Sequence, residues 1–347
     1  METNWNQYFF KHTETYSDKP WDWECLSANP NITWEIVETN PDKPWDWSYL
    51  SYNSNITMDI VEANPDKPWD WYFLSYNPNI TWEFVKANID ELWDWEFLSE
   101  HPNITMDMVK ANPDEQWNWS FLSLNPNITW EFVEANIYQP WDWEWLSQNP
   151  NITWDIVKLN PIKQWRWKYI SQNPNITWDI VEANLNKPWN WKMLSKNSNI
   201  TWDIIKANPD KPWSWTVLSK NPNITWDIVE TNPDKPWDWK MLSRYMNLTF
   251  KFLLKNQDKP WNWKMLSINP NITWNIVEMN LDKPWDWGML SSNKFGKEKK
   301  TFELRIKHQK FVQEHLFEEF VKAYMHPTRI QKLLNMGYSV DELDEVL

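Results

Sequence analysis

Apolar and polar positions alternate along this chain in a pattern that returns every 24 residues. The first tryptophan of a Trp-x-Trp element falls at residues 21, 45, 69, 93, 117, 141, 165, 189, 213, 237, 261 and 285. A fixed period without insertions is the sequence signature of stacked, equal structural units. The chain therefore predicts twelve units, numbered here by their Trp-x-Trp pairs, each burying its apolar face only against its neighbours.

Each unit is interpreted as two short helices separated by prolines. In residues 31–53, Thr33 is a good N-cap for the first helix, and Asn40 ends it because a residue before proline avoids the helical region. In the second half, Asp42 can cap a helix that holds Pro44 in its first turn, where a missing N–H costs little. Helices shorter than about 12 residues are marginal in water, so stacking must stabilise them.

A parallel β-helix is the structural alternative, because residues 45–49 alternate between aromatic and polar side chains. Adjacent apolar pairs such as Ile36 with Val37, and Tyr49 with Leu50, fit a helix better. The chain also holds only 3 glycines, which are too few for the tight corners of β-coils. Helices are therefore favoured.

The resulting prediction is an all-α solenoid of short helix pairs with a small helical C-terminal module. Its expected divisions are an N-terminal cap over residues 1–17, the twelve-unit repeat solenoid over 18–293, and a linker with the helical module over 294–347. We expect the solenoid to be elongated. We also expect residues 297–347 to cover the apolar face of the last unit around Trp285 and Trp287, since terminal repeats need a cap.

Charge and cysteine content narrow the functional classes. A net charge of −14 argues against a surface that binds nucleic acid or anionic lipid throughout, because such partners need a positive field. Cys25 is the only cysteine, which is typical of a reducing compartment. No signal peptide and no apolar run of about 18 residues stands out. The sequence therefore predicts a cytoplasmic protein that is not secreted and contacts no membrane.

The repeated motif also carries a family resemblance. Asn-Ile-Thr-Trp-Asp/Glu-Ile-Val followed by Lys-Pro-Trp-Asp-Trp, in tandem over residues 18–293, resembles tryptophan-rich tandem-repeat proteins of giant DNA viruses. Residues 326–338 are similar to the tails of such proteins. The resemblance implies a host-cell cytoplasm or a virion as the setting, and it implies no catalytic residues.

Candidate chemistry in the sequence is weak. Each Asn-Ile-Thr triplet is formally a glycosylation sequon, but a threonine N-cap and an asparagine turn explain it without export. The five histidines lack metal-ligand spacing, and phosphate-binding glycine loops are absent, so we expect no catalytic residues, no metal and no cofactor. Repeated serines such as Ser51 are expected to bond backbone carbonyls. Residues 336–338, Met-Gly-Tyr, resemble a ubiquitin-associated turn, although a plain terminal hairpin explains them better.

The variation between units is the most informative feature, because invariant positions build a solenoid's core and variable positions line its recognition surface. The residue after Trp-x-Trp changes from Glu24, Ser48, Tyr72, Glu96, Ser120 and Glu144 to Lys168, Lys192, Thr216, Lys240 and Lys264. Four residues further on, the series runs Ala28, Tyr52, Tyr76, Glu100, Leu124, Gln148, Gln172, Lys196, Lys220, Arg244 and Ile268. The sign of the charge changes near the middle in both rows.

These rows predict a partner-binding site. Its residues are Lys168, Lys192, Lys196, Lys220, Lys240, Arg244 and Lys264. The predicted function is that of a non-enzymatic repeat scaffold that binds an acidic protein partner through this variable face. The alternative is nucleic-acid or glycan binding by the basic and aromatic surface, although nucleic acid fits the overall charge poorly. The sequence leaves the oligomeric state open.

Overall fold

The computed structural model describes residues 4–247, 250–312 and 331, which fall into two compact parts. One part comprises residues 6–295, and the other part comprises residues 1–5 together with 296–347. The described residues form helices and turns and contain no strand. The prediction of an all-α array of helix pairs is therefore confirmed, and the β-helix alternative is wrong.

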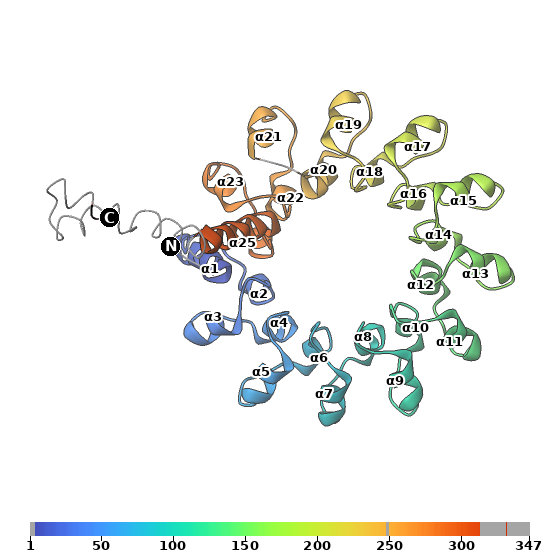
Figure 1. Ribbon diagram of the computed structural model, residues 1–347, viewed down its shortest axis with the longest axis horizontal. Helices are drawn as coiled ribbons and strands as arrows, with labels where there is room; N and C mark the ends of the chain where they lie inside the picture. The colour runs from blue at the N-terminus through green and yellow to red at the C-terminus, as the bar shows by residue number, and fades with distance from the viewer. Residues whose placement is uncertain (1–3, 248–249, 313–330, 332–347) are drawn as a thin grey trace. The chain divides into compact units, whose positions relative to one another are not determined.

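The repeat unit is a pair of short helices, one on the outside and one on the inside of the array (Figure 1). The outer helices are α1 (Trp5–Thr15), α3 (Trp34–Thr39), α5 (Met58–Ala63), α7 (Trp82–Ala87), α9 (Met106–Ala111), α11 (Trp130–Ala135), α13 (Trp154–Leu159), α15 (Trp178–Ala183), α17 (Trp202–Ala207), α19 (Trp226–Thr231), α21 (Phe250–Lys255) and α23 (Trp274–Glu278). The inner helices are α2 (Trp23–Ser27), α4 (Trp47–Tyr52), α6 (Trp71–Leu74), α8 (Trp95–Glu100), α10 (Trp119–Leu122), α12 (Trp143–Gln148), α14 (Trp167–Ile170), α16 (Trp191–Leu194), α18 (Trp215–Leu218), α20 (Trp239–Tyr245), α22 (Trp263–Ser267) and α24 (Trp287–Ser291).

The inner helix begins later than the sequence analysis expects. In the second unit the N-cap is Asp46, whose carboxylate accepts a hydrogen bond of 3.0 Å from the backbone N–H of Tyr49. Asp42 and Pro44 lie in the turn before it, so their expected roles as cap and first-turn residue are wrong. A short polar side chain between the two tryptophans satisfies the free N–H groups of the first turn and thereby fixes where the helix starts.

The outer helix follows the expected signals. Its N-cap is the predicted threonine: Thr33 caps α3 with extended backbone, and the hydroxyl of Thr81 accepts a bond of 3.2 Å from the Phe84 N–H in α7. Asn40 ends α3. The carbonyl of Asn40 then accepts the indole N–H of Trp45 at 2.8 Å, and the same bond recurs in later units. The first tryptophan of each pair thus binds a free carbonyl at the helix end.

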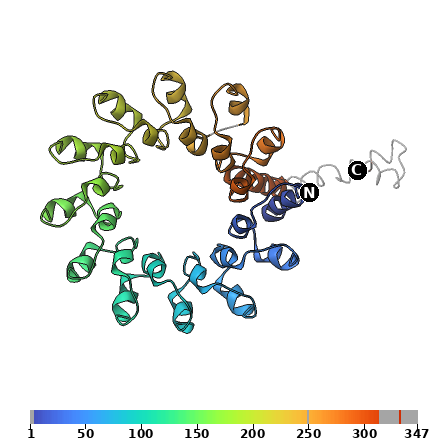
Figure 2. The ribbon, with the colours of Figure 1, turned by 180° about the vertical axis from the view of Figure 1, so that it is seen from behind.

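Residues 6–295 form a ring rather than the elongated array that we expected. Figures 1 and 2 show the odd-numbered helices α3 to α23 on the outer circumference and the even-numbered helices α2 to α22 on the inner one. Helix α2 contacts α24 as it contacts α4. The stack curves steadily enough for its last unit to meet its first.

The closing contacts repeat those of an interior junction. The Asp22 N–H donates to Ser291 Oγ at 3.0 Å, as the Asp46 N–H donates to Ser27 Oγ at 2.9 Å. Trp21 and Trp287 lie 5.1 Å apart with an angle of 81° between their rings, as do Trp45 and Trp23. The ring therefore closes by the same geometry that stacks every unit.

The first unit covers the apolar face of the twelfth. Trp21 packs against both Trp287 and Trp274 of the last unit. Unit 1 thus packs on the face around Trp287 that was assigned to residues 297–347 from the sequence, and most of that segment lies outside the described residues. Helix α1 takes the outer position of unit 1 despite its different sequence, and its Phe10 stacks on Trp45 as Trp34 packs on Trp69.

Buried asparagines join consecutive units. The amide of Asn53 donates to the carbonyls of Ser27, Asn29 and Ile32 at 2.7 to 3.2 Å, and Asn53 is 1% exposed. We call this row of asparagines the asparagine ladder; its members are Asn29, Asn53, Asn77, Asn125, Asn149, Asn173, Asn197, Asn221, Asn269 and Asn293. The amide of Asn55, a sequon asparagine, likewise donates to the carbonyls of the unit before.

Serine hydroxyls complete each junction. Ser51 donates to the Trp47 carbonyl at 2.8 Å and accepts from the Asp70 N–H of the next unit at 2.9 Å. The expectation that these serines bind backbone carbonyls is confirmed, and the structure adds the bond between units.

Two units interrupt the asparagine ladder. In unit 4, His101 takes the place of the asparagine and is 6% exposed. In unit 10, helix α20 extends through Tyr245, so that the buried residue is Met246 and the carbonyl of Met246 accepts from Asn269. The tryptophan contacts to the next unit persist at both places, with ring centres 5.3 Å apart for Trp95 and Trp117 and 5.2 Å apart for Trp239 and Trp261.

In the other compact part, the structure describes residues 4–5, 296–312 and 331. Helix α25 (Gly296–Phe311) begins within a lysine-rich stretch at residues 294–300, and its Phe302 lies edge-on to Trp5 with ring centres 5.6 Å apart. The Met-Gly-Tyr segment at 336–338 lies outside the described residues. Within the described ranges, no helix is both long enough and apolar enough to cross a lipid bilayer.

Candidate binding surface on the inner helices

Both variable rows lie on the inner helices or just after their C-terminal ends. Each inner helix is covered on two sides by the neighbouring inner helices. An outer helix packs on its third side, as Trp34 of α3 packs on Trp47 of α4. Leu50 on the packed side is fully buried, whereas Glu24, Tyr72, Glu96 and their equivalents are exposed or half-buried. Because the remaining open side of an inner helix is the one toward the middle of the ring, we infer that the rows face that way.

The seven basic residues predicted from the sequence lie in five consecutive units, 7 to 11, on the inner helices or just after their C-terminal ends. Lys220 and Arg244 are half-buried, and the other five are exposed. Lys264 forms an ion pair of 3.2 Å with Asp286, and Lys196 donates to Gln172 at 3.3 Å. We call these seven residues the basic arc.

Most of the charge of the basic arc is available to a partner. The ammonium of Lys168 lies 4.9 Å from the ring centre of Tyr169, and the guanidinium of Arg244 lies 5.3 Å from that of Tyr245. Lys192, Lys220 and Lys240 have no ion pair with any described residue. Unpaired like charges in a row repel one another, so an anionic ligand would relieve that repulsion.

A third row, which the sequence analysis missed, lies beside the other two. Two positions after each Trp-x-Trp, units 2 to 7 carry aromatic residues: Tyr49, Phe73, Phe97, Phe121, Trp145 and Tyr169. Units 8 to 12 carry Met193, Val217, Met241, Met265 and Met289 instead. The signal was present in the sequence as this change of residue type, but the position appeared to be part of the core.

The aromatic residues of this row form a continuous surface with the exposed tyrosines. Ring centres lie 5.6 Å apart for Tyr49 and Phe73, 5.8 Å for Phe97 and Phe121, and 5.0 Å for Phe121 and Trp145. We call the set Tyr49, Tyr52, Tyr72, Phe73, Tyr76, Phe97, Phe121 and Trp145 the aromatic arc.

Tyr76 holds the middle of the aromatic arc together. Its ring stacks on Phe97 with centres 3.6 Å apart, and its hydroxyl lies 3.3 Å from the Tyr72 hydroxyl and 3.5 Å from the Asp94 carboxylate. Burial, and then the hydrogen bond with Tyr72, raise the pKa of Tyr76 far above its usual value. Tyr76 therefore stays neutral and acts as a hydrogen-bond donor at any physiological pH.

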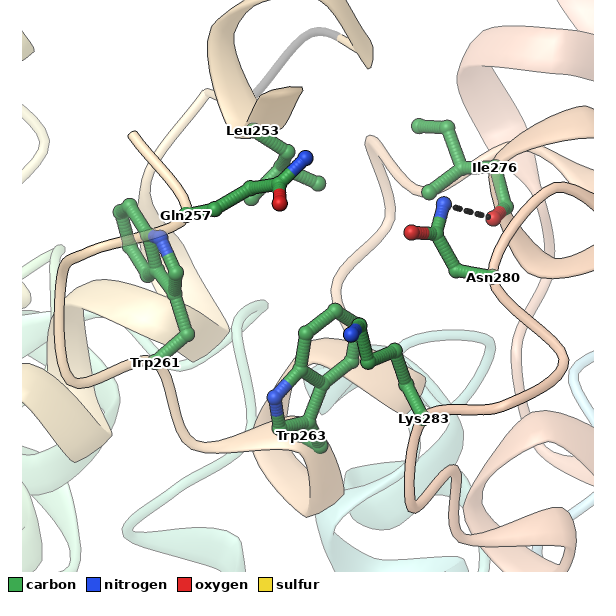
Figure 3. A pocket seen from close by; sticks show the side chains of 7 residues that line it. All are labelled: Leu253, Gln257, Trp261, Trp263, Ile276, Asn280 and Lys283. Carbon is green, nitrogen blue, oxygen red and sulfur yellow. Dashed lines mark hydrogen bonds between the residues drawn. The ribbon is translucent and has the colours of Figure 1, made fainter. Parts of the chain in front are cut away.

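A crevice recurs between neighbouring units, and its volume differs from one junction to the next. The example between units 11 and 12 has a volume of about 150 Å³ (Figure 3). Its walls are Leu253, Gln257, Trp261, Trp263, Ile276, Asn280 and Lys283. At equivalent positions Lys187, Lys211 and Lys235 lie 5.5 to 5.9 Å over the tryptophan of the preceding unit, so the protein's own lysine covers the indole face. The equivalent crevice between units 5 and 6 has a volume of about 350 Å³, and there Lys110 lies 5.5 Å over the ring of Phe132.

Comparisons with known proteins identify no relative. No protein-family model, no curated protein sequence and no solved structure matches this chain. Over the described residues, no three His, Cys, Asp or Glu side chains gather in a way that could hold a metal ion.

Proposed function

We propose that this protein is a non-enzymatic scaffold that binds an acidic protein partner on the basic arc. The observation that carries the proposal is the row of cationic side chains in five consecutive units, of which Lys192, Lys220 and Lys240 have no ion pair with any described residue. A charged side chain that is buried or ion-paired serves to stabilise the fold. Exposed and unpaired charges in register favour a ligand of opposite sign.

The ring limits the size of that partner. Twelve inner helices spaced by about 9 Å lie on a circle about 34 Å across, and their side chains extend about 5 to 6 Å inward. The width left is on the order of 20 Å, which accommodates one or two polypeptide segments, since an α-helix with side chains is about 10 to 12 Å wide. A folded domain would have to bind elsewhere.

A charge reversal on the basic arc tests the proposal. The variant Lys192→Glu, Lys220→Glu and Lys240→Glu changes the net charge from −14 to −20. The matched control reverses Lys110, Lys158 and Lys206 on outer helices, which changes the net charge equally. A fluorescent polyglutamate peptide of about 20 residues is the probe, and its binding is followed by anisotropy at two salt concentrations.

We expect the inner reversal to abolish polyglutamate binding and its salt dependence, and the outer reversal to reduce binding by less than about threefold through the general field. Equal losses in the two variants would contradict the proposal. A single-stranded oligonucleotide of the same length is the second probe. Tighter binding of the oligonucleotide than of the peptide would favour the alternative, nucleic-acid binding.

The setting is proposed from the sequence resemblance alone. We propose that the scaffold acts in the cytoplasm of a cell infected by a giant DNA virus, or in the virion. Affinity purification from infected cells, with the inner-reversal variant as the control, would identify the partner by mass spectrometry.

A further inference from the structure

We propose that the aromatic arc is a second binding surface, which takes arginine side chains of the same extended polypeptide that presents acidic residues to the basic arc. This inference deepens the proposed function and rests on it for the identity of the partner as a polypeptide. Its own support comes from units 2 to 6, which hold none of the seven basic residues.

Packing alone does not explain the aromatic residues. Phe73, Phe97 and Phe121 are half-buried between inner helices, and Met193 and Met241 are half-buried at the equivalent positions. Neighbouring units stack in the same way in both halves of the ring. Methionine therefore fills this position as well as an aromatic side chain does. The aromatic residues of units 2 to 6 therefore have a function beyond packing.

Exposure points to the same conclusion. Tyr52 and Tyr72 are 44% and 48% exposed, although tyrosine can bury most of its ring. They contact Tyr76 with ring centres 6.3 and 5.7 Å away. Because Tyr76 is itself fixed on Phe97, the exposed tyrosines stand on a rigid base. A rigid, exposed aromatic surface pays little conformational entropy when a ligand binds.

The charges beside the aromatic arc select a cationic ligand. Glu96, Glu100 and Glu144 lie on α8 and α12, and none of them forms an ion pair with a described residue. Glu100 is half-buried, and this burial, followed by the charge of Asp94, raises the pKa of its carboxyl. An arginine side chain can stack its guanidinium on a tyrosine and bond a carboxylate at the same time.

The same charges disfavour the other ligands of aromatic surfaces. Nucleobases stack on tyrosine, but their phosphates would meet the unpaired carboxylates of Glu96, Glu100 and Glu144. Neutral sugars would leave those carboxylates without a counter-charge. A polypeptide with arginine toward units 2 to 6 and with acidic residues toward units 7 to 11 satisfies both halves of the ring.

The test compares two labelled probes and three variants. The probes are a dodecaarginine and a dodecalysine peptide, followed by fluorescence anisotropy at physiological salt. The aromatic variant is Tyr52→Leu with Tyr72→Leu, and its control is Tyr138→Leu, since Tyr138 is fully exposed on an outer loop. The carboxylate variant is Glu96→Gln, Glu100→Gln and Glu144→Gln, and its control is Glu83→Gln, Glu131→Gln and Glu134→Gln on outer helices.

We expect the wild-type ring to bind dodecaarginine more tightly than dodecalysine. The aromatic variant should weaken dodecaarginine binding by about 5- to 30-fold, since two cation–π contacts contribute about 0.5 to 1 kcal/mol each. The carboxylate variant should weaken both peptides by about 10-fold or more. Both controls should stay within about threefold of wild type, and unchanged melting temperatures should exclude misfolding as the cause.

Equal losses in the aromatic variant and in Tyr138→Leu would overturn the inference, as would equal affinity for the two peptides. Saturable binding of a neutral oligosaccharide that the aromatic variant abolishes would overturn it in favour of a glycan site. The polyglutamate experiment on the basic arc stands apart from these results. Loss of dodecaarginine binding with intact polyglutamate binding, or the reverse, shows which of the two surfaces fails.

Discussion

The closing junction and the interior junctions of the ring differ in one respect: the chain runs through the interior ones and not through the closing one. Between units 1 and 2 the backbone passes directly from α2 to α3, whereas units 12 and 1 meet through side chains and hydrogen bonds alone. Asn29 nevertheless donates to Ser291 and Asn293 at 2.7 and 3.1 Å, as Asn53 donates to Ser27 and Asn29 at 2.7 and 3.0 Å. Closure therefore follows from the geometry of the unit.

Twelve equal units in a full turn rotate by 360° divided by twelve, or about 30° each. A head-to-tail interface closes only when its rotation divides the circle, and otherwise gives an open superhelix. The number of units and the shape of the junction are thus matched, and the comparison between the two kinds of junction can be tested directly.

A disulfide across the closing junction should have the largest effect. The Ser292 hydroxyl hydrogen-bonds the Cys25 thiol, so Ser292→Cys places a second sulfur next to the first. Oxidation would close a loop of nearly the whole ring, worth about 5 kcal/mol by the entropy of loop closure. Denaturant unfolding under oxidising and reducing conditions measures the difference.

The matched control places the same pair one junction earlier, as Ile268→Cys with Met289→Cys in a Cys25→Ser background. This pair closes a loop of about 20 residues, which is worth about 3 kcal/mol. A closing disulfide that fails to form, or that stabilises less than the control, would mean that units 12 and 1 are not in contact in solution.

Loss of a ladder asparagine should come next. Asn29→Ala removes two bonds at the closing junction, and Asn173→Ala removes three of 3.0 Å each at an interior junction. Both leave buried carbonyls without a donor, at a cost of about 1 to 3 kcal/mol for each variant.

The two asparagine variants should differ in shape. Asn29→Ala should let the ring open and increase the radius of gyration measured by small-angle X-ray scattering, whereas Asn173→Ala should leave the radius unchanged because the chain holds that junction. An equal radius in both variants would show that closure does not depend on the asparagine ladder.

The helix pairs could be predicted from the sequence because their signals are local. Thr33 and Asn40 mark the ends of an outer helix through their own side chains and a neighbouring proline. Closure could not be predicted in this way, because it depends on a rotation of about 30° per unit that no residue type signals. Helix α1 shows the difficulty: Phe10 stands where later units have tryptophan, so the repeat was not visible there.

The binding surface was only partly predictable for a similar reason. The basic arc is visible as a change of charge between equivalent positions. The aromatic arc is not visible in the sequence, because Phe97 and Phe121 have the residue type expected in the core. The structure shows instead that their rings are half-buried and in contact from unit to unit.

One interior junction should respond to pH where the closing one does not. In unit 4 the Nδ1 atom of His101 accepts the Asn103 N–H at 3.1 Å, a role that only the neutral ring can fill. Burial lowers the pKa of His101, and a backbone hydrogen bond with Asn77 opposes this shift more weakly. The unfolded chain therefore takes up a proton first, near pH 6.5.

Stability should consequently be complete above pH 6.5 and should fall as the pH decreases through that value. His101→Asn restores the asparagine ladder and should remove this part of the pH dependence. Unfolding free energies of both proteins at pH 7.5 and 5.5 measure it, and the raised pKa of Glu100 contributes equally to each. An identical decrease in both proteins would mean that His101 is protonated without cost.

The smallest expected effect concerns Gly288, where the closing junction lacks a side-chain contact that is found at two interior junctions. At the equivalent position Ser48 Oγ donates to Asp70 Oδ2 at 2.8 Å, and Lys264 pairs with Asp286. A Cβ atom added at Gly288 would lie 3.8 Å from Asp22 Oδ2, in ordinary contact distance. A serine hydroxyl at this position would therefore reach the Asp22 carboxylate.

Gly288→Ser should stabilise the ring by about 1 to 2 kcal/mol, of which about 0.5 to 1 comes from replacing glycine in a helix and the rest from the new hydrogen bond. Gly288→Ala provides only the first part and is the control. Urea denaturation midpoints separate the two contributions. If serine stabilises no more than alanine does, residue 288 and Asp22 are not adjacent in solution, and the closing junction departs from the interior geometry at this contact. If Gly288→Ser stabilises the ring more than Gly288→Ala does, by the energy of one hydrogen bond, then residue 288 and Asp22 form the contact that Ser48 and Asp70 form at an interior junction.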